Sequence, residues 1–116
     1  MNERLSDYLD QMIETAENIC AYVDGMNKHD FLADKRTQQA VILNLMIIGE
    51  AAARMSQDHN ALASRYPDVP WRNMRGMRNR IAHGYFGINL DVVWDTVCKA
   101  VPPLLEQVSK IRKSEN

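Results

Sequence analysis

The chain has 116 residues, of which 25% are charged and 46% are hydrophobic, and its formal net charge is -1. These values are typical of one soluble globular domain that spans residues 1–116, and they exclude a disordered chain. Proteins that coat DNA are usually basic throughout, so we expect no DNA partner, and any contact with nucleic acid should be local.

The sequence also argues against contact with a membrane. The longest apolar run, residues 40–48, is interrupted by Asn44, whereas a membrane-spanning helix needs about 20 apolar residues. The chain starts with charged residues, and no apolar signal segment follows them. We therefore expect a cytoplasmic protein.

Apolar residues recur every three or four positions in residues 2–23, which predicts an amphipathic helix. Asn2 could cap the start of this helix, and Gly25 is a natural terminator. Residues 26–33 are predicted to form a connector, which Phe31–Leu32 would attach to the core.

A second predicted helix begins after Asp34, a good N-cap residue, and runs to about Ser56. It is apolar on nearly all sides. Such a helix either lies at the centre of the bundle or is covered by a second subunit. Few other helices are available in so short a chain, so we favour the second subunit. Gly49 would let another helix approach closely.

Residues 58–66 predict a helical turn or two. Pro70 is suited to the first position of the next helix, which carries several arginines from Trp71 to about His83–Gly84. We find no alternating pattern typical of strands. The sequence therefore predicts an all-α protein.

Asn89 can cap a final helix, in which Pro102–Pro103 would cause a kink. The tail, residues 110–116, is expected to be frayed. Cys20 and Cys98 lack the spacing of a zinc site or of a redox pair, so we predict that both are buried core residues.

The arginine-rich helix concentrates positive charge, because no Asp or Glu occurs between Asp68 and Asp91. Such a cluster favours an anionic ligand, and phosphate is the obvious candidate. The cluster comprises Arg72, Arg75, Arg78 and Arg80, and His83 and Tyr85 follow it.

These residue types suit the metal-independent cleavage of RNA. A histidine can transfer a proton near neutral pH, and an arginine can stabilise charge on a phosphate. Arg78 and His83 are five positions apart, about 140° around a helix, so a shared site needs a distorted helix end or two copies of the segment. A two-fold axis would supply the second copy. No Asp/Glu cluster lies nearby, so no metal or other cofactor is expected.

An alternative without function remains open for these residues. His83 could simply face the dipole at the C-terminal end of its helix, and the arginines could form a solvated face. Glu50 could orient an arginine or emerge into solvent, and Tyr85 could pack on Met74 and Ile81.

The segment Arg78-Asn-Arg-Ile-Ala-His83-Gly-Tyr85 resembles the Arg-x4-His-x-Tyr motif of the HepT-like toxins, a branch of the HEPN ribonuclease superfamily. The similarity covers nearly the whole chain, because other segments resemble the family's pattern in the same order. These segments are Asp7-Tyr8-Leu9, Phe31-Leu32-Ala-Asp34-Lys-Arg-Thr, Ile48-Gly49-Glu50-Ala51-Ala52, Tyr66-Pro67-Asp-Val-Pro70-Trp71-Arg72 and Val93-Trp94.

The resemblance implies an up-and-down bundle of about five helices and a homodimer with an RNase cleft at its interface. Arg78 and His83 would be catalytic, with Asn79 and Glu50 as supporting polar residues. Arg72, Arg75 and Arg80 are predicted to bind the phosphates of the RNA.

Proteins of this family are typically the toxin of a type VII toxin–antitoxin system. The antitoxin is an MntA-like nucleotidyltransferase that transfers AMP from ATP to the motif tyrosine, here Tyr85. The added negative charge and bulk would block the cleft. The competing hypotheses are a module that binds RNA or a nucleotide without cutting it, and a scaffold partner of the nucleotidyltransferase.

Overall fold

The structure, a computed structural model, describes residues 3–115, and every regular element in that range is helical. The prediction of an all-α protein is therefore confirmed. The elements in order are α1 (Glu3–Tyr22), α2 (Lys28–Leu32), α3 (Lys35–Asp58), α4 (Asn60–Arg65), α5 (Trp71–Gly84), the 3-10 turn η1 (Tyr85–Gly87), α6 (Leu90–Asp95), the π-helical turn η2 (Thr96–Ala100) and α7 (Val101–Ser114).

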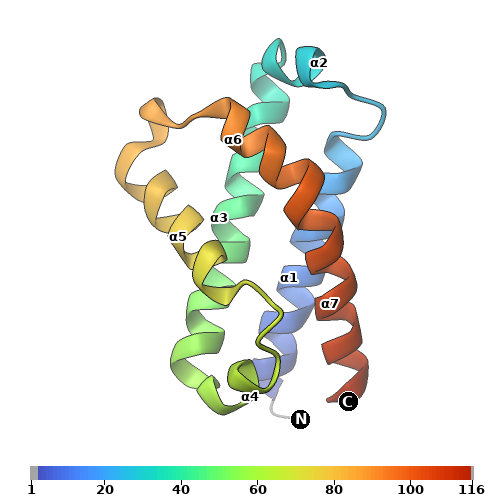
Figure 1. Ribbon diagram of the computed structural model, residues 1–116, viewed down its shortest axis with the longest axis vertical. Helices are drawn as coiled ribbons and strands as arrows, with labels where there is room; N and C mark the ends of the chain where they lie inside the picture. The colour runs from blue at the N-terminus through green and yellow to red at the C-terminus, as the bar shows by residue number, and fades with distance from the viewer. Residues whose placement is uncertain (1–2, 116) are drawn as a thin grey trace.

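The long helices run alternately up and down, as expected, with α3 at the centre between α5 on one side and α1 and α7 on the other (Figure 1). The core lies where α1, α3 and α7 meet, and its fully buried side chains include Leu9, Met12, Val41, Met55 and Val108. The described parts of the two ends of the chain lie at the same end of the bundle (Figure 1). The short α4 confirms the helical turn or two predicted for residues 58–66, whereas α2 was not predicted.

Short polar residues set the helix boundaries where the sequence placed them. The Asp34 carboxylate accepts a hydrogen bond from the Thr37 backbone N–H at 3.0 Å, and Asn89 caps α6 in the same way. Gly25 has a φ of 77°, the left-handed conformation that ends a helix without steric cost. The proposed cap at Asn2 lies outside the described residues. Pro70 is the residue before α5 rather than its first helical residue, a difference of one position.

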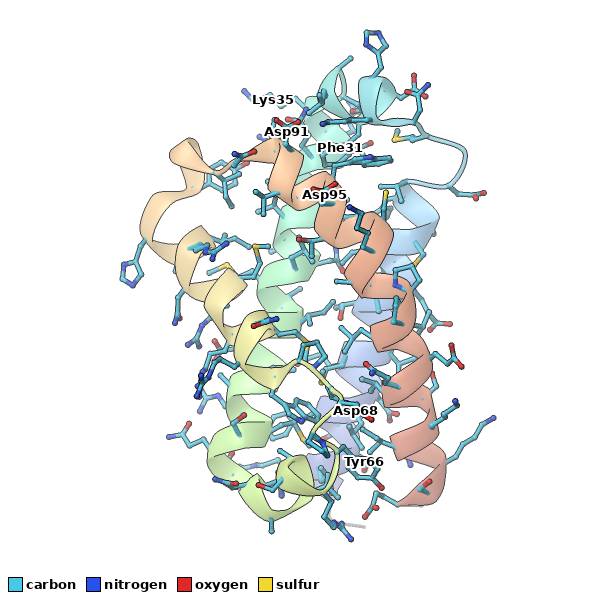
Figure 2. The ribbon with its side chains drawn as sticks, in the orientation of Figure 1. Phe31, Lys35, Tyr66, Asp68, Asp91 and Asp95 are labelled. Carbon is cyan, nitrogen blue, oxygen red and sulfur yellow. The ribbon has the colours of Figure 1, made fainter. Side chains whose placement is uncertain are left out.

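The connector before α3 is more ordered than predicted. It contains α2, whose start is fixed by reciprocal hydrogen bonds between Asn27 and Asp30. Phe31 is fully buried, and its ring centroid lies 5.2 Å from that of Trp94. Figure 2 shows Phe31 beside α6, near Asp95. Leu32, by contrast, is exposed, so the prediction of an anchoring role is confirmed only for Phe31.

The last helical segment continues through its two prolines by way of a π-helical turn. Pro102 and Pro103 have no N–H to donate to the preceding turn. Directly before them, the N–H of Val101 bonds to the Thr96 carbonyl, five residues back. The wider turn accommodates the missing donors, so the predicted irregularity takes the form of a π-bulge.

The central position of α3 explains most of its apolar surface. Its buried residues face α1 on one side and α5 on the other, so the alternative that we did not favour accounts for most of the pattern. What remains is an exposed Leu43, with 58% of its surface accessible, and a half-buried Met46 and Ile47. On α3, this residual patch is the surface that a second subunit could still cover.

Two smaller predictions are wrong. Cys98 is exposed in η2, whereas Cys20 is half-buried on α1, and burial raises the pKa of the Cys20 thiol. The tail is helical to Ser114 rather than frayed, and the Tyr66 hydroxyl donates to Glu115 at 2.8 Å. Figure 2 shows Tyr66 at the end of the bundle where α7 finishes.

Candidate active site

The arginine-rich segment forms α5, which packs mainly against α3. Met74 and Ile81 are its buried residues, and most of its other side chains face the surface. A helix with so few apolar residues is held by one narrow seam, so its flanks stay open for a ligand.

Gly49 on α3 makes that seam unusually close. A Cβ at this position would overlap the Arg78 Cβ and lie 2.6 Å from the Met74 carbonyl oxygen. The missing side chain therefore lets the two helix backbones approach, as the sequence suggested. The consequence is that Glu50, the next residue of α3, comes within reach of α5.

Arg78 is fixed from two directions. Its Nη1 donates to Glu50 Oε2 at 2.7 Å, and its Nε donates to Asn79 Oδ1 at 3.0 Å. The second oxygen of Glu50 accepts from Arg54 Nε at 3.2 Å. Of the two alternatives for Glu50, the structure shows the contact with an arginine. The Arg78 side chain is 25% exposed, so it is held without being sealed from solvent.

The charge on Glu50 is stabilised by these contacts. The hydrogen bond from Arg78 is the main reason that the pKa of the Glu50 carboxyl lies below its ordinary value, and the positive charges of Arg78 and Arg54 act in the same direction. Partial burial opposes them. The carboxylate is therefore ionised near neutral pH and can brace both arginines.

An open polar groove of about 480 Å³ lies beside Arg78, between α3 and α5. We call it the Arg78 groove. Its arginines outnumber its single carboxylate, so it suits an anion. It is lined by Glu50, Ala53, Arg54, Ser56, Gln57, Arg75 and Arg78. Sequence reasoning missed Arg54, Ser56 and Gln57, although the spacing of four between Glu50 and Arg54 signals a shared helix face.

His83 is exposed in the last turn of α5 and borders a different hollow. That hollow has a volume of about 410 Å³ and lies between the end of α5 and the start of α6. It is lined by Met77, Arg80, His83, Gly84, Gly87, Ile88, Asn89, Val92 and Val93. One subunit therefore does not bring Arg78 and His83 into one groove, as their spacing along the helix implied.

Tyr85 begins η1, directly after α5, and is 39% exposed. The structure therefore leaves Tyr85 partly accessible at the surface.

Of the other predicted arginines, two lie apart from Arg78 and one lies beside it. Arg72 and Arg80 line a third groove on the opposite flank of α5, next to α6 and α7, whereas Arg75 shares the groove of Arg78. The basic cluster of the sequence is therefore divided between two surfaces.

Within residues 3–115, no three His, Cys, Asp or Glu side chains gather where they could hold a metal ion. In the same range, no helix combines the length and apolar character needed to cross a membrane.

Comparison with known proteins places these features in a family. Residues 12–111 match the family described as "Ribonuclease HepT-like". The protein named "Probable ribonuclease HepT" from Thermococcus cleftensis is 40% identical over 113 residues, which cover 97% of this chain and 100% of that protein. "Putative RNase MJ0127" from Methanocaldococcus jannaschii is 37% identical over 106 residues, which cover 91% of this chain and 85% of that protein. No solved structure gives a significant match. From the family match and these relatives, we conclude that the chain belongs to the HepT-like ribonuclease family.

Proposed function

We propose that the protein is a metal-independent endoribonuclease with Arg78 and His83 as its catalytic residues. The observation that carries the proposal is the way Arg78 is held, with Glu50 and Asn79 orienting its guanidinium beside a groove that also contains Arg75. A donor fixed before the substrate arrives can stabilise charge that develops on a phosphate without first having to reorganise.

The chemistry uses the 2′-hydroxyl of the RNA as the nucleophile. Its oxygen attacks the adjacent phosphorus, the bond from phosphorus to the 5′ oxygen breaks, and a 2′,3′-cyclic phosphate and a 5′-hydroxyl are formed. His83 transfers a proton in this step, and Arg78 donates hydrogen bonds to the non-bridging phosphate oxygens. The proton lost by the 2′-hydroxyl is balanced by the proton gained by the leaving oxygen.

A homodimer would bring the two residues together. On α3, Leu43, Ile47 and Glu50 follow one another at helical spacing, so the residual apolar patch continues directly into the carboxylate that holds Arg78. A second subunit packed on Leu43 would therefore reach the edge of the Arg78 groove. By two-fold symmetry, each of two such grooves could receive His83 from the other subunit.

The test is cleavage of single-stranded RNA by the purified protein. His83→Ala should slow cleavage by about a hundred- to ten-thousand-fold, while His29→Ala, which changes an exposed histidine on α2, should not. Cleavage should persist in EDTA. Loss of activity in EDTA contradicts the metal-independent mechanism. Binding of RNA by the wild type without any cleavage favours the competing hypothesis of a binding module.

We further propose that the protein is the toxin of a toxin–antitoxin pair and that AMP transfer to Tyr85 inactivates it. The Tyr85 hydroxyl attacks the α-phosphate of ATP, pyrophosphate leaves, and a phosphodiester joins AMP to the ring. The exposure of Tyr85 just after the arginine-rich helix supports this role, because the partner enzyme must reach the hydroxyl. The attached phosphate adds negative charge near the surface that would bind RNA.

This second proposal is tested with ATP and an MntA-like nucleotidyltransferase encoded beside the gene. Intact-mass and peptide analysis should locate AMP on Tyr85, and Tyr85→Phe should prevent the modification. Tyr22→Phe is the matched control, because Tyr22 is 42% exposed, close to the value for Tyr85. AMP on Tyr22, or no adduct on the wild type, contradicts the proposal.

A further inference from the structure

A second groove lies on the flank of α5 that faces away from Arg78. It has a volume of about 610 Å³, and it runs between α5 and the α6–α7 segment with α3 as its floor. We call it the α5–α7 groove. It is lined by Leu45, Ile48, Pro70, Arg72, Asn73, Met74, Gly76, Met77, Arg80, Val92, Thr96, Ala100, Val101 and Leu104, and it shares no residue with the Arg78 groove.

The lining of the α5–α7 groove is mostly aliphatic, and its charged residues are all positive. Within the described chain, Arg72 and Arg80 have no ion pair or side-chain hydrogen bond. Asp68, the acidic residue that comes just before Arg72 in the sequence, forms no ion pair with it within the described chain. The acidic residues that follow Arg80 are paired elsewhere, because Asp91 pairs with Lys28 at 2.9 Å and Asp95 with Lys99 at 4.0 Å. Carboxylates on a ligand would therefore be attracted to this rim.

The lining residues also indicate what kind of ligand fits. None of them is aromatic, and proteins that hold nucleobases without sequence preference usually stack them on aromatic rings. Met74, Met77 and Val92 instead offer flexible or branched aliphatic surface, which adapts to the side chains of another protein. These features fit a helix that inserts aliphatic anchors at positions i, i+3, i+4 and i+7.

We propose that the α5–α7 groove is a docking site for an acidic amphipathic helix of a partner protein. Leucine-like anchors enter the aliphatic floor, and Asp or Glu residues beside them pair with Arg72 and Arg80. This proposal does not depend on the proposed RNase activity, since neither Arg78 nor Tyr85 lines the groove. Its far end adjoins the hollow of His83 through Met77, Arg80 and Val92, so a bound helix would lie next to that histidine.

The test uses a designed helical peptide with leucines at the anchor positions and glutamates on either side. Two control peptides replace the glutamates with lysines or the leucines with serines. The glutamate peptide should bind the full-length protein and shift the NMR methyl signal of Met77, whereas neither control should bind comparably. Equal binding of the lysine peptide, or no binding of any peptide, overturns the proposal.

Two charge reversals on α5 distinguish ligand binding in the α5–α7 groove from ligand binding in the Arg78 groove. Arg72→Glu places a negative charge beside the ligand's glutamates, so it should weaken peptide binding by about tenfold or more and affect RNA binding less. Arg75→Glu is the matched variant, because Arg75 is also exposed and lies in the Arg78 groove. Arg75→Glu should weaken RNA binding more than peptide binding. The peptide result stands even if no RNA is bound.

Ala100→Trp tests the aliphatic lining of the groove without involving charge. Ala100 is exposed and does not border the hollow of His83, so an indole at this position should fill the groove and displace the peptide. Two results would show that the groove has another occupant. One is a shift of the Met77 methyl signal caused by single-stranded RNA and not by the peptide. The other is a loss of self-association in the Ala100→Trp variant, as measured by sedimentation.

Discussion

The two flanks of α5 carry the same kind of residue in different states. On one flank, Arg78 is held by Glu50 at 2.7 Å and by Asn79 at 3.0 Å. On the other flank, Arg72 and Arg80 have no side-chain partner among the described residues and border an aliphatic groove. One short helix therefore offers both an oriented guanidinium and guanidiniums that have no side-chain partner in the described part of the chain.

The difference matters because an arginine has distinct uses in the two states. An oriented guanidinium presents its remaining donors in a fixed direction, which favours stabilisation of a transition state. A mobile guanidinium can follow a charged ligand over a surface, which favours capture and steering. This contrast is why we propose catalysis on the flank of Arg78 and partner binding on the flank of Arg72.

The largest expected effect comes from removing the oriented arginine. Arg78→Ala should lower the rate of RNA cleavage by about a hundred- to a thousandfold, because a preorganised donor is lost. Arg72→Ala should have a much smaller effect. Arg112→Ala is the structural control, since Arg112 is 29% exposed and pairs with Asp10 at 2.8 Å, far along the chain from the site. Similar losses for Arg78→Ala and Arg72→Ala would remove the distinction between the flanks.

The proposed dimer should depend on the α3 side of the molecule only. Leu43→Glu would bury an unpaired charge in the interface and should weaken dimerisation by about a hundredfold or more. Val92→Glu is the comparison, because Val92 is 39% exposed but lines the α5–α7 groove. Sedimentation at several concentrations measures both. If Val92→Glu disrupted the dimer and Leu43→Glu did not, the interface would lie at the α5–α7 groove, which contradicts the proposed interface on α3.

Alanine substitutions at two glycines distinguish the effect of close helix packing on stability from the effect of helix propensity. Gly49→Ala should destabilise the protein by about 1–3 kcal/mol, because its Cβ would push α5 away from α3. Gly76→Ala should instead stabilise by about 0.5–1 kcal/mol, since a Cβ there meets no atom within 4 Å and alanine favours a helix. Urea unfolding measures both changes. If Gly49→Ala were harmless, the seam would be looser than the structure shows.

The smallest expected effect concerns how the stability supplied by the contact between Glu50 and Arg78 depends on pH. The pKa of Glu50 is lowered, so its contribution to stability is fully present above about pH 4.5, its ordinary pKa, and is lost as the pH falls through the lowered value. Because the side chain is 46% exposed, solvent screening limits the contribution to less than about 1 kcal/mol. Glu50→Gln should remove this part of the acid dependence and also lower the rate of cleavage. An unchanged pH profile of stability would contradict the assignment.

Several features of the fold follow from the sequence alone. The periodic apolar residues of α1 and α7 face the core as predicted, because a helix buries one stripe wherever its neighbours lie. Asp34 and Asn89 cap their helices because capping involves only residues two or three positions away. Local interactions of this kind can be predicted from the sequence, because the residues that make them are close together along the chain.

Other features depend on which helices become neighbours. The apolar surface of α3 suggested a large interface, but α1 and α5 cover most of it. Cys98 lies on an apolar segment and yet is exposed, because the π-helical turn alters which side of the helix faces the core. The spacing of apolar residues shows which face of a helix is apolar, but it does not show which neighbouring element will cover that face.

The candidate site shows the same division. The residues Arg78, His83 and Tyr85 were identified from their order along the chain. By contrast, the contact of Glu50 with Arg78 joins residues 28 positions apart. It exists because Gly49 lets α3 and α5 approach. The separation of the arginines between two grooves has a similar origin. Their angular positions on α5 place Arg75 and Arg78 in the groove beside α3, and place Arg72 and Arg80 in the groove between α5 and the α6–α7 segment. The sequence by itself determined the helices and the reactive residue types, and the packing around α5 decided which of those residues work together.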